Sequence, residues 1–162
     1  MRGRRWWLGA VVCALAVHGA GAAPSDDADD QALLQDADYI AGRAALKSGD
    51  AAAALRRFES ALRRFPDSAD LHNELGFAHR KLRQMDKAFE HYKRALVIDP
   101  RHRGAHEYIG EAYLMVGDVA SAEQHRAALR SICLLPCEEL IDLEKAISEH
   151  RAQDNAHRPQ SR

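Results

Sequence analysis

One stretch of the chain decides the fold, and it covers residues 69–102, ADLHNELGFAHRKLRQMDKAFEHYKRALVIDPRH. In its first half, apolar side chains recur every three or four residues, which is the spacing of one face of an α-helix. These side chains are Leu71, Leu75, Ala78 and Leu82. After a short break, the same spacing returns in Ala88, Tyr92, Ala95 and Leu96. The stretch therefore predicts two amphipathic helices joined by a short turn.

The same pattern recurs on both sides of this stretch at a constant interval, the one that separates Gly42 from Gly76 and Gly76 from Gly110. Small, aromatic and proline positions share this register, and such a period is typical of repeat proteins. The recurring positions are Gly42, Gly76 and Gly110; Ala54, Ala88 and Ala122; Phe58 and Tyr92; Ala61 and Ala95; and Pro66 and Pro100. The chain is therefore expected to contain three units, 35–68, 69–102 and 103–136.

Glycine-aspartate pairs mark the breaks inside the outer units, at Gly49-Asp50 and Gly117-Asp118. Glycine adopts the left-handed conformation that ends many helices, and an aspartate side chain caps the first turn of the next helix. Each unit is therefore expected to be a pair of helices.

These positions resemble the tetratricopeptide repeat (TPR) family, and the resemblance covers roughly residues 35–134. It implies an all-α fold, a right-handed α-solenoid of three TPR helix pairs. The third unit departs from the family pattern in three places. It has Arg126 where an aromatic residue is usual, Leu129 where alanine is usual, and Leu134 in place of the final proline. We therefore expect weaker packing of its second helix.

A solenoid needs a terminal helix with a polar side to cover its last apolar face. Residues 137–150 are expected to form this capping helix, because Leu140, Leu143 and Ile147 recur on one side of it. Residues 151–162 lack an apolar stripe and are expected to form a disordered tail. The prediction is seven helices in all.

The N-terminus has the organisation of a secretory signal peptide. An arginine-rich start precedes an apolar stretch and then small residues, and cleavage is expected after Ala22. The signal peptide is thus residues 1–22, and residues 23–34 are expected to be an acidic flexible segment. The mature protein would be periplasmic or secreted. An uncleaved signal that anchors the chain in a membrane is the alternative.

Composition and motifs exclude several classes of function. The 23 Lys and Arg residues nearly balance 24 Asp and Glu, so no positive field favours nucleic acid. The sequence has no phosphate-binding glycine loop, dinucleotide fingerprint or nucleophile elbow. His72, His79 and His106 occupy positions where the family packs large rings between helices. We therefore expect no enzyme activity, no cofactor and no metal site.

Two cysteines, Cys133 and Cys137, lie where the third unit meets the expected capping helix. In an oxidising compartment the simplest expectation is one disulfide, which would fix the angle of the capping helix. The alternative is redox or metal-binding chemistry at this pair. The run 132–140 resembles sequences of small exported bacterial TPR proteins.

In TPR proteins, the first helix of each pair lines a concave surface, so the resemblance implies a partner-binding groove. Its expected residues are Tyr39, Arg43, Lys47, Asn73, Phe77, Arg80, Lys81, Glu107, Glu111 and Leu114. The first two units supply positive side chains, which would complement an acidic or C-terminal peptide segment.

The leading hypothesis is a non-catalytic protein-protein interaction adaptor of the periplasm. It would bind a segment of an envelope or secreted protein and assist assembly of an envelope complex, which is an analogy with the family. Two alternatives remain open. One is a thiol-redox or metal-handling accessory protein that uses Cys133 and Cys137. The other is a homo-oligomer formed through Leu114 and Met115.

Overall fold

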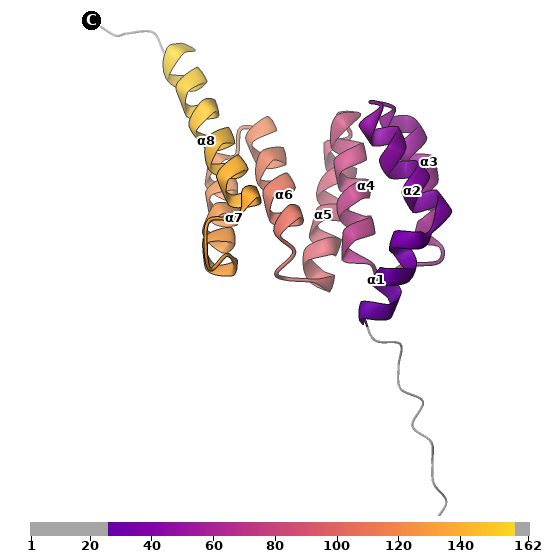
Figure 1. Ribbon diagram of the computed structural model, residues 1–162. Coiled ribbons are helices and arrows are strands. Elements are labelled where there is room, and N and C mark those ends of the chain that lie inside the picture. The colour runs from indigo at the N-terminus through magenta and orange to yellow at the C-terminus, as the bar shows by residue number, and fades with distance from the viewer. Residues whose placement is uncertain (1–25, 158–162) are drawn as a thin grey trace, which may run out of the picture.

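The computed structural model describes residues 26–157, and within this range the chain forms eight α-helices and no strand. The helices are α1 (Asp26–Gln35), α2 (Ala37–Lys47), α3 (Ala51–Leu62), α4 (Ala69–Lys81), α5 (Met85–Ile98), α6 (Arg103–Met115), α7 (Val119–Ile132) and α8 (Glu138–His157). Helices α2 and α3, α4 and α5, and α6 and α7 form three pairs that stack side by side (Figure 1). The described chain is therefore all-α, as expected.

The turn inside each pair has the same backbone conformation. Gly49, Arg83 and Gly117 occupy the same position in successive units, and their φ angles are 85°, 60° and 80°. Asp50 and Asp118 then cap α3 and α7, because each side chain accepts a hydrogen bond from a backbone N–H in the first helical turn. The middle unit makes this turn with an arginine, in a conformation that costs a non-glycine residue roughly 1–2 kcal/mol.

In the first two units, a glycine of the first helix lies against a ring of the second. A Cβ atom added to Gly42 would collide with the ring of Phe58. A Cβ atom on Gly76 would lie 2.6 Å from two ring carbons of Tyr92. Both rings are completely buried. The recurring glycines therefore allow the two helices of each pair to approach closely.

The third unit closes in a different way, because Arg126 occupies the ring position. The Arg126 guanidinium pairs with Glu123, at 2.6 Å, and lies 4.0 Å from Glu144 of α8. Leu143 of α8 is completely buried and packs against Gly110, where an added Cβ atom would lie 2.8 Å from its methyl carbons. Figure 1 shows α8 against α6 and α7 at the end of the stack.

The N-terminal boundary differs from the sequence-based expectation. Residues 26–35 form α1 and not a flexible segment, because Leu33 is completely buried in the core of the first two units. Acidic residues dominate the start of this helix, and its single buried leucine was too weak a periodic signal to predict it. The predicted signal peptide, 1–22, lies outside the described residues.

The C-terminal boundary also differs. Helix α8 extends to His157, so residues 151–157 belong to the helix and not to a disordered tail. Arg151 lies in this extension and pairs with Glu123 of α7 at 2.6 Å. The extension is therefore tied to the third unit by an ion pair. Nothing in the sequence indicated this contact, because the extension has no apolar stripe.

Within residues 26–157, none of the helices combines the length and the hydropathy that crossing a membrane requires.

Candidate functional site

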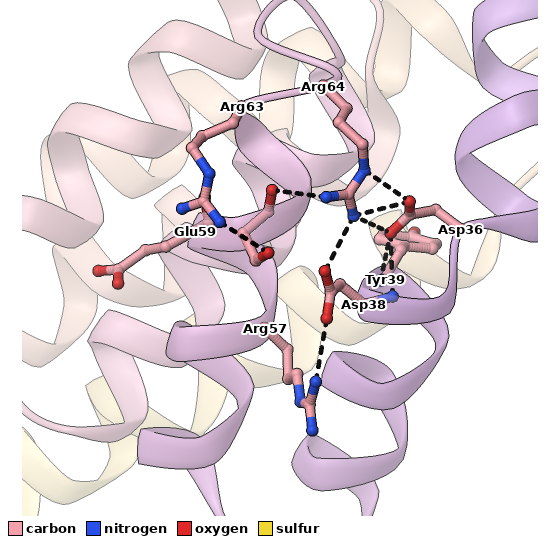
Figure 2. Close-up of polar contacts among 8 residues, drawn as sticks. Asp36, Asp38, Tyr39, Arg57, Glu59, Arg63 and Arg64 are labelled. Atoms are coloured by element: carbon pink, nitrogen blue, oxygen red, sulfur yellow. Dashed lines mark hydrogen bonds and ion pairs between the residues drawn. The ribbon is translucent and has the colours of Figure 1, made fainter.

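A network of charged side chains fixes the start of α2 (Figure 2). Asp36 caps the helix and accepts hydrogen bonds from the backbone N–H groups of Asp38 and Tyr39, both at 3.0 Å. The guanidinium of Arg64 donates to Asp36 at 2.7 and 2.9 Å and to Asp38 at 3.0 Å. These bonds from Arg64 are the main cause of a lowered pKa at Asp36. The network holds the first helix of the predicted groove against the end of α3.

A hollow of about 550 Å³ opens across α2, α4 and α6. Its lining residues come from these helices, from α1 and α8, and from the connection between α5 and α6. They are Leu34, Tyr39, Arg43, Asp70, Glu74, Asp99, Arg101, His102, Arg103, Gly104, Tyr108 and Glu139. The lining carries both signs of charge, and two predicted groove residues, Tyr39 and Arg43, belong to it.

Ion pairs connect the neighbouring first helices. Arg43 of α2 lies 3.5 Å from Glu74 of α4, and Arg80 of α4 lies 2.6 Å from Glu111 of α6. The Arg80 side chain is only 11% exposed. Two of the predicted positive side chains are thus already paired within the protein. The positive surface expected in the first two units is therefore neutralised at two of its four side chains.

Aromatic rings fill the boundary between α4 and α6. The ring centroids of Phe77 and Tyr108 are 5.0 Å apart. The Arg80 guanidinium lies 5.2 Å from the first ring and 5.5 Å from the second, and the Lys81 ammonium lies 5.0 Å from the Phe77 ring. Burial raises the pKa of Tyr108 to about 12, so its hydroxyl stays protonated at neutral pH. Phe77, Arg80 and Lys81 therefore lie together, outside the lining of the hollow, and their part in binding stays a prediction.

Asn73 lies on α4 at the same boundary and is only 8% exposed. Within the described part of the chain, its side-chain oxygen has no hydrogen-bond partner. A Cβ atom on Gly104 of α6 would lie 3.3 Å from its amide nitrogen, and Gly104 itself lines the hollow. A buried acceptor without a partner costs about 1–3 kcal/mol. Asn73 thus has a buried acceptor without a partner, and its amide nitrogen lies beside the lining of the hollow.

Helix α8 changes the third unit's part of the predicted groove. Leu114 is only 7% exposed because it packs in one cluster with Leu140 and Leu143. Contrary to the prediction, it is not available to a partner. Glu107 lies at the boundary of α6 and α8. Burial, followed by repulsion from neighbouring carboxylates of both helices, raises its pKa to about 8. The capping helix therefore covers part of this surface.

Tyr39 and Lys47 are the two remaining predicted groove residues. The Tyr39 ring is 3% exposed and packs 5.9 Å from Phe58, so only its edge reaches the hollow. Lys47 is the last residue of α2 and does not line the hollow. Sequence reasoning missed Glu74 and Tyr108, which do line it. They share the sixth position of the second and third units, and this shared repeat position is the signal that could have identified them.

Cys133 and Cys137 form a disulfide that joins the end of α7 to the start of α8. The loop that they enclose presents two leucines, Leu134, fully exposed, and Leu135, 79% exposed. Within residues 26–157, no three histidine, cysteine or acidic side chains are grouped so that they could hold a metal ion.

Comparisons with known proteins identify the repeat and the fold. The tetratricopeptide repeat family matches residues 39–103. No curated protein matches the chain. Among solved structures, the chain is similar to the TPR2B domain in the pHsp70 complex of yeast Sti1, with 19% identity and a TM-score of 0.66 over 72% of this chain and 94% of that one. It is also similar to the Sgt2 TPR domain from Aspergillus fumigatus, with 19% identity and a TM-score of 0.65 over 86% of this chain and 89% of that one.

Proposed function

Because this chain is a tetratricopeptide repeat protein, we propose that it is a non-catalytic adaptor that binds a segment of a partner protein in the hollow across α2, α4 and α6. The similar TPR2B domain of Sti1 is in a complex with pHsp70. That likeness supports the choice of a protein partner.

The observation that supports this proposal most is the buried amide of Asn73. Its oxygen is a buried acceptor without a hydrogen-bond partner among residues 26–157, and its amide nitrogen lies beside Gly104, a residue of the hollow's lining. The backbone N–H of an extended peptide is a matching donor, because each residue of such a peptide exposes one. The ion pairs of the lining, Arg43–Glu74 and Arg103–Glu139, favour a segment of mixed charge over a strongly acidic one.

We further propose that the partner is an envelope or secreted protein, and that binding assists assembly of an envelope complex. The basis is the predicted signal peptide at residues 1–22, which would export the chain.

Filling the hollow tests the proposal. In Gly104→Gln, the new side chain occupies space beside Asn73, and replacing a helical glycine offsets the close contact by up to about 1 kcal/mol. Arg56→Gln is the matched control, because Arg56 is exposed on α3 and does not line the hollow. Each protein is used to capture partners from separated envelope and cytoplasmic fractions of the source cells, followed by mass spectrometry.

The proposal predicts an envelope or secreted protein that the wild type and Arg56→Gln retain and that Gly104→Gln loses. Circular dichroism checks that all three proteins remain folded. A partner retained equally by all three would place binding outside the hollow. A partner found only in the cytoplasmic fraction would contradict the proposed location and leave the adaptor role in place.

A further inference from the structure

The two helices of each pair touch through the same two repeat positions, but the chemistry of the contact differs between units. In the first unit, these positions hold Asp38 and Arg57, which form an ion pair at 3.0 Å (Figure 2). In the second unit they hold His72 of α4 and His91 of α5, whose Nδ1 atoms are 3.0 Å apart. A contact between opposite charges is thus replaced by one between two titratable rings.

A backbone carbonyl determines which protons the second-unit pair carries. The Nε2 atom of His72 lies 3.1 Å from the carbonyl oxygen of Pro66, which can only accept a hydrogen bond. His72 must therefore carry its proton on Nε2, and when neutral its Nδ1 is an acceptor. His91 must then donate from Nδ1. The contact is complete when both rings are neutral.

The third unit repeats this arrangement at the equivalent positions. The Nδ1 atoms of His106 and His125 are 2.9 Å apart, and Nε2 of His106 lies 3.1 Å from the carbonyl oxygen of Pro100. The same protonation states follow. The arrangement therefore occurs twice, in α4 with α5 and in α6 with α7.

Each pair accommodates one additional proton but not two. If His72 binds a proton at Nδ1, it can donate to His91 only after His91 moves its own proton to Nε2. A second proton would place two N–H groups and two positive charges face to face across 3.0 Å. The two rings therefore titrate as a coupled unit, and acid first charges and then opens the contact.

The surroundings of the second-unit pair oppose protonation overall. The ring of His79 stacks on His91 with centroids 5.3 Å apart. Burial, followed by the nearby His72, His79 and Lys87, lowers the pKa of His91 to about 4. Burial also lowers the pKa of His72, with Arg94 in the same direction and Asp67, Glu90 and the Pro66 carbonyl in the opposite one.

The third-unit pair has a similar environment. The ring of Tyr113 stacks on His125 with centroids 5.7 Å apart. Burial, followed by the nearby His106, lowers the pKa of His125 to about 4. Burial lowers the pKa of His106 as well; His102 acts in the same direction, and Asp99 and the Pro100 carbonyl act in the opposite one.

We propose that the pairs His72–His91 and His106–His125 are a pH-sensitive latch. In mildly acidic solution, separated histidines bind protons more readily than the closed pairs do. This difference weakens the contacts of α4 with α5 and of α6 with α7, while Asp38–Arg57 continues to hold α2 and α3 together. This inference concerns the fold and does not depend on the proposed adaptor role.

The direction of the effect follows from linkage between protonation and folding. Each histidine has a lower pKa in the folded chain than its ordinary 6.5. Below pH 6.5 the unfolded chain therefore binds more protons than the folded chain. The free energy of unfolding therefore keeps the full contribution of these pairs above about pH 7, and that contribution decreases as the pH falls through 6.5 toward about 4.

The test replaces each histidine pair with the chain's own ion pair, in the variant His72→Asp, His91→Arg, His106→Asp, His125→Arg. His157→Gln is the control, because His157 is exposed at the end of α8. Urea unfolding is measured at pH 7.5 and pH 5. For the wild type and the control, we expect the unfolding equilibrium constant to increase by about tenfold per pair on acidification, beyond any increase in the variant. Equal pH dependence in the wild type and the variant would overturn the proposal.

A second measurement on the wild type does not require the variant to fold. Nitrogen NMR shifts report which ring nitrogen carries the proton. We expect Nε2–H at His72 and His106, Nδ1–H at His91 and His125, and titration of all four rings below pH 6.5. Titration of either pair at 6.5, with the tautomers of free imidazole, would overturn the proposal.

Discussion

The second and third units solve one packing problem in two ways. In the second unit, the glycine of the first helix, Gly76, is covered by the unit's own ring, Tyr92. The third unit has Arg126 in the ring position, and its glycine, Gly110, is covered by Leu143 of α8. What the fold requires is therefore a large apolar side chain over the glycine, whichever helix supplies it.

The difference makes α8 a part of the third unit. In addition to the buried leucine, Arg130 of α7 contacts Glu144 of α8 at 2.5 Å, and Arg151 contacts Glu123 at 2.6 Å. Exposed ion pairs of this kind contribute about 0–1 kcal/mol each. Leu143 is thus expected to contribute most of the stabilisation, and the ion pairs to set the direction of the helix.

The largest expected effect is in the second unit. Tyr92→Ala removes a completely buried ring and should lower the free energy of unfolding by about 3–5 kcal/mol. Urea unfolding followed by circular dichroism measures it, with the exposed neighbour Lys93→Ala as the control. A loss below about 1 kcal/mol would contradict the role of the ring.

The equivalent change in the third unit is Leu143→Ala. We expect a loss of about 2–4 kcal/mol, because Leu143 is completely buried but smaller than the ring. Ile141→Ala is the matched control on the same helix, since Ile141 is 53% exposed and should cost less than about 1 kcal/mol. Equal losses in the two variants would show that α8 does not pack through Leu143.

Adding a methyl group to each glycine sharpens the comparison. Gly76→Ala presses against the rigid ring of Tyr92, so we expect a loss of about 1–3 kcal/mol. Gly110→Ala meets the end of a flexible leucine, and the better helix propensity of alanine offsets up to about 1 kcal/mol. Its stability should remain within about 1 kcal/mol of the wild type. The opposite order in thermal unfolding would contradict this account.

The disulfide should matter less than the buried leucine. The loop between Cys133 and Cys137 is short, so the Cys133→Ser, Cys137→Ser variant should lose up to about 2 kcal/mol. Thiol labelling of the native wild type after mild reduction checks whether the bond is structural. Resistance to reduction is expected, and ready reduction and re-formation would favour redox chemistry instead.

A pH-dependent effect concerns Glu107 at the boundary of α6 and α8. Its pKa in the folded chain is about 8, above its ordinary 4.5, so the folded chain holds its proton more tightly than the unfolded chain. Its contribution to stability therefore falls as the pH rises from 4.5 to 8. Glu107→Gln should raise the melting temperature more at pH 8 than at pH 5. An equal shift at both values would contradict the raised pKa.

Much of the fold was predictable because the repeat fixes local chemistry. The glycines at 42, 76 and 110 marked the close approaches, and Gly49 and Gly117 marked two of the turns. Helix α1 was not predictable, since one buried leucine, Leu33, gives no periodic pattern. To predict that Leu143 takes the place of the third ring, one must know the path of α8, and the repeat does not specify that path.

The candidate site was predictable only in part. Repeat positions placed Phe77, Arg80 and Lys81 on one helix face, where they lie together, and their part in binding stays a prediction. The partners that neutralise the positive side chains were not predictable. Glu74 and Glu111 each lie on the first helix of the following pair, and their distance from an arginine depends on how the pairs stack.

The most direct test of the central claim, that α8 completes the third unit, is native-state hydrogen exchange of the Leu143→Ala variant. Contacts in a repeat protein are between neighbours, so a local defect should have a local effect. We predict faster exchange of the α6, α7 and α8 amides, with protection in α2 to α5 unchanged. Faster exchange confined to α8, with α6 and α7 still protected, would contradict the account.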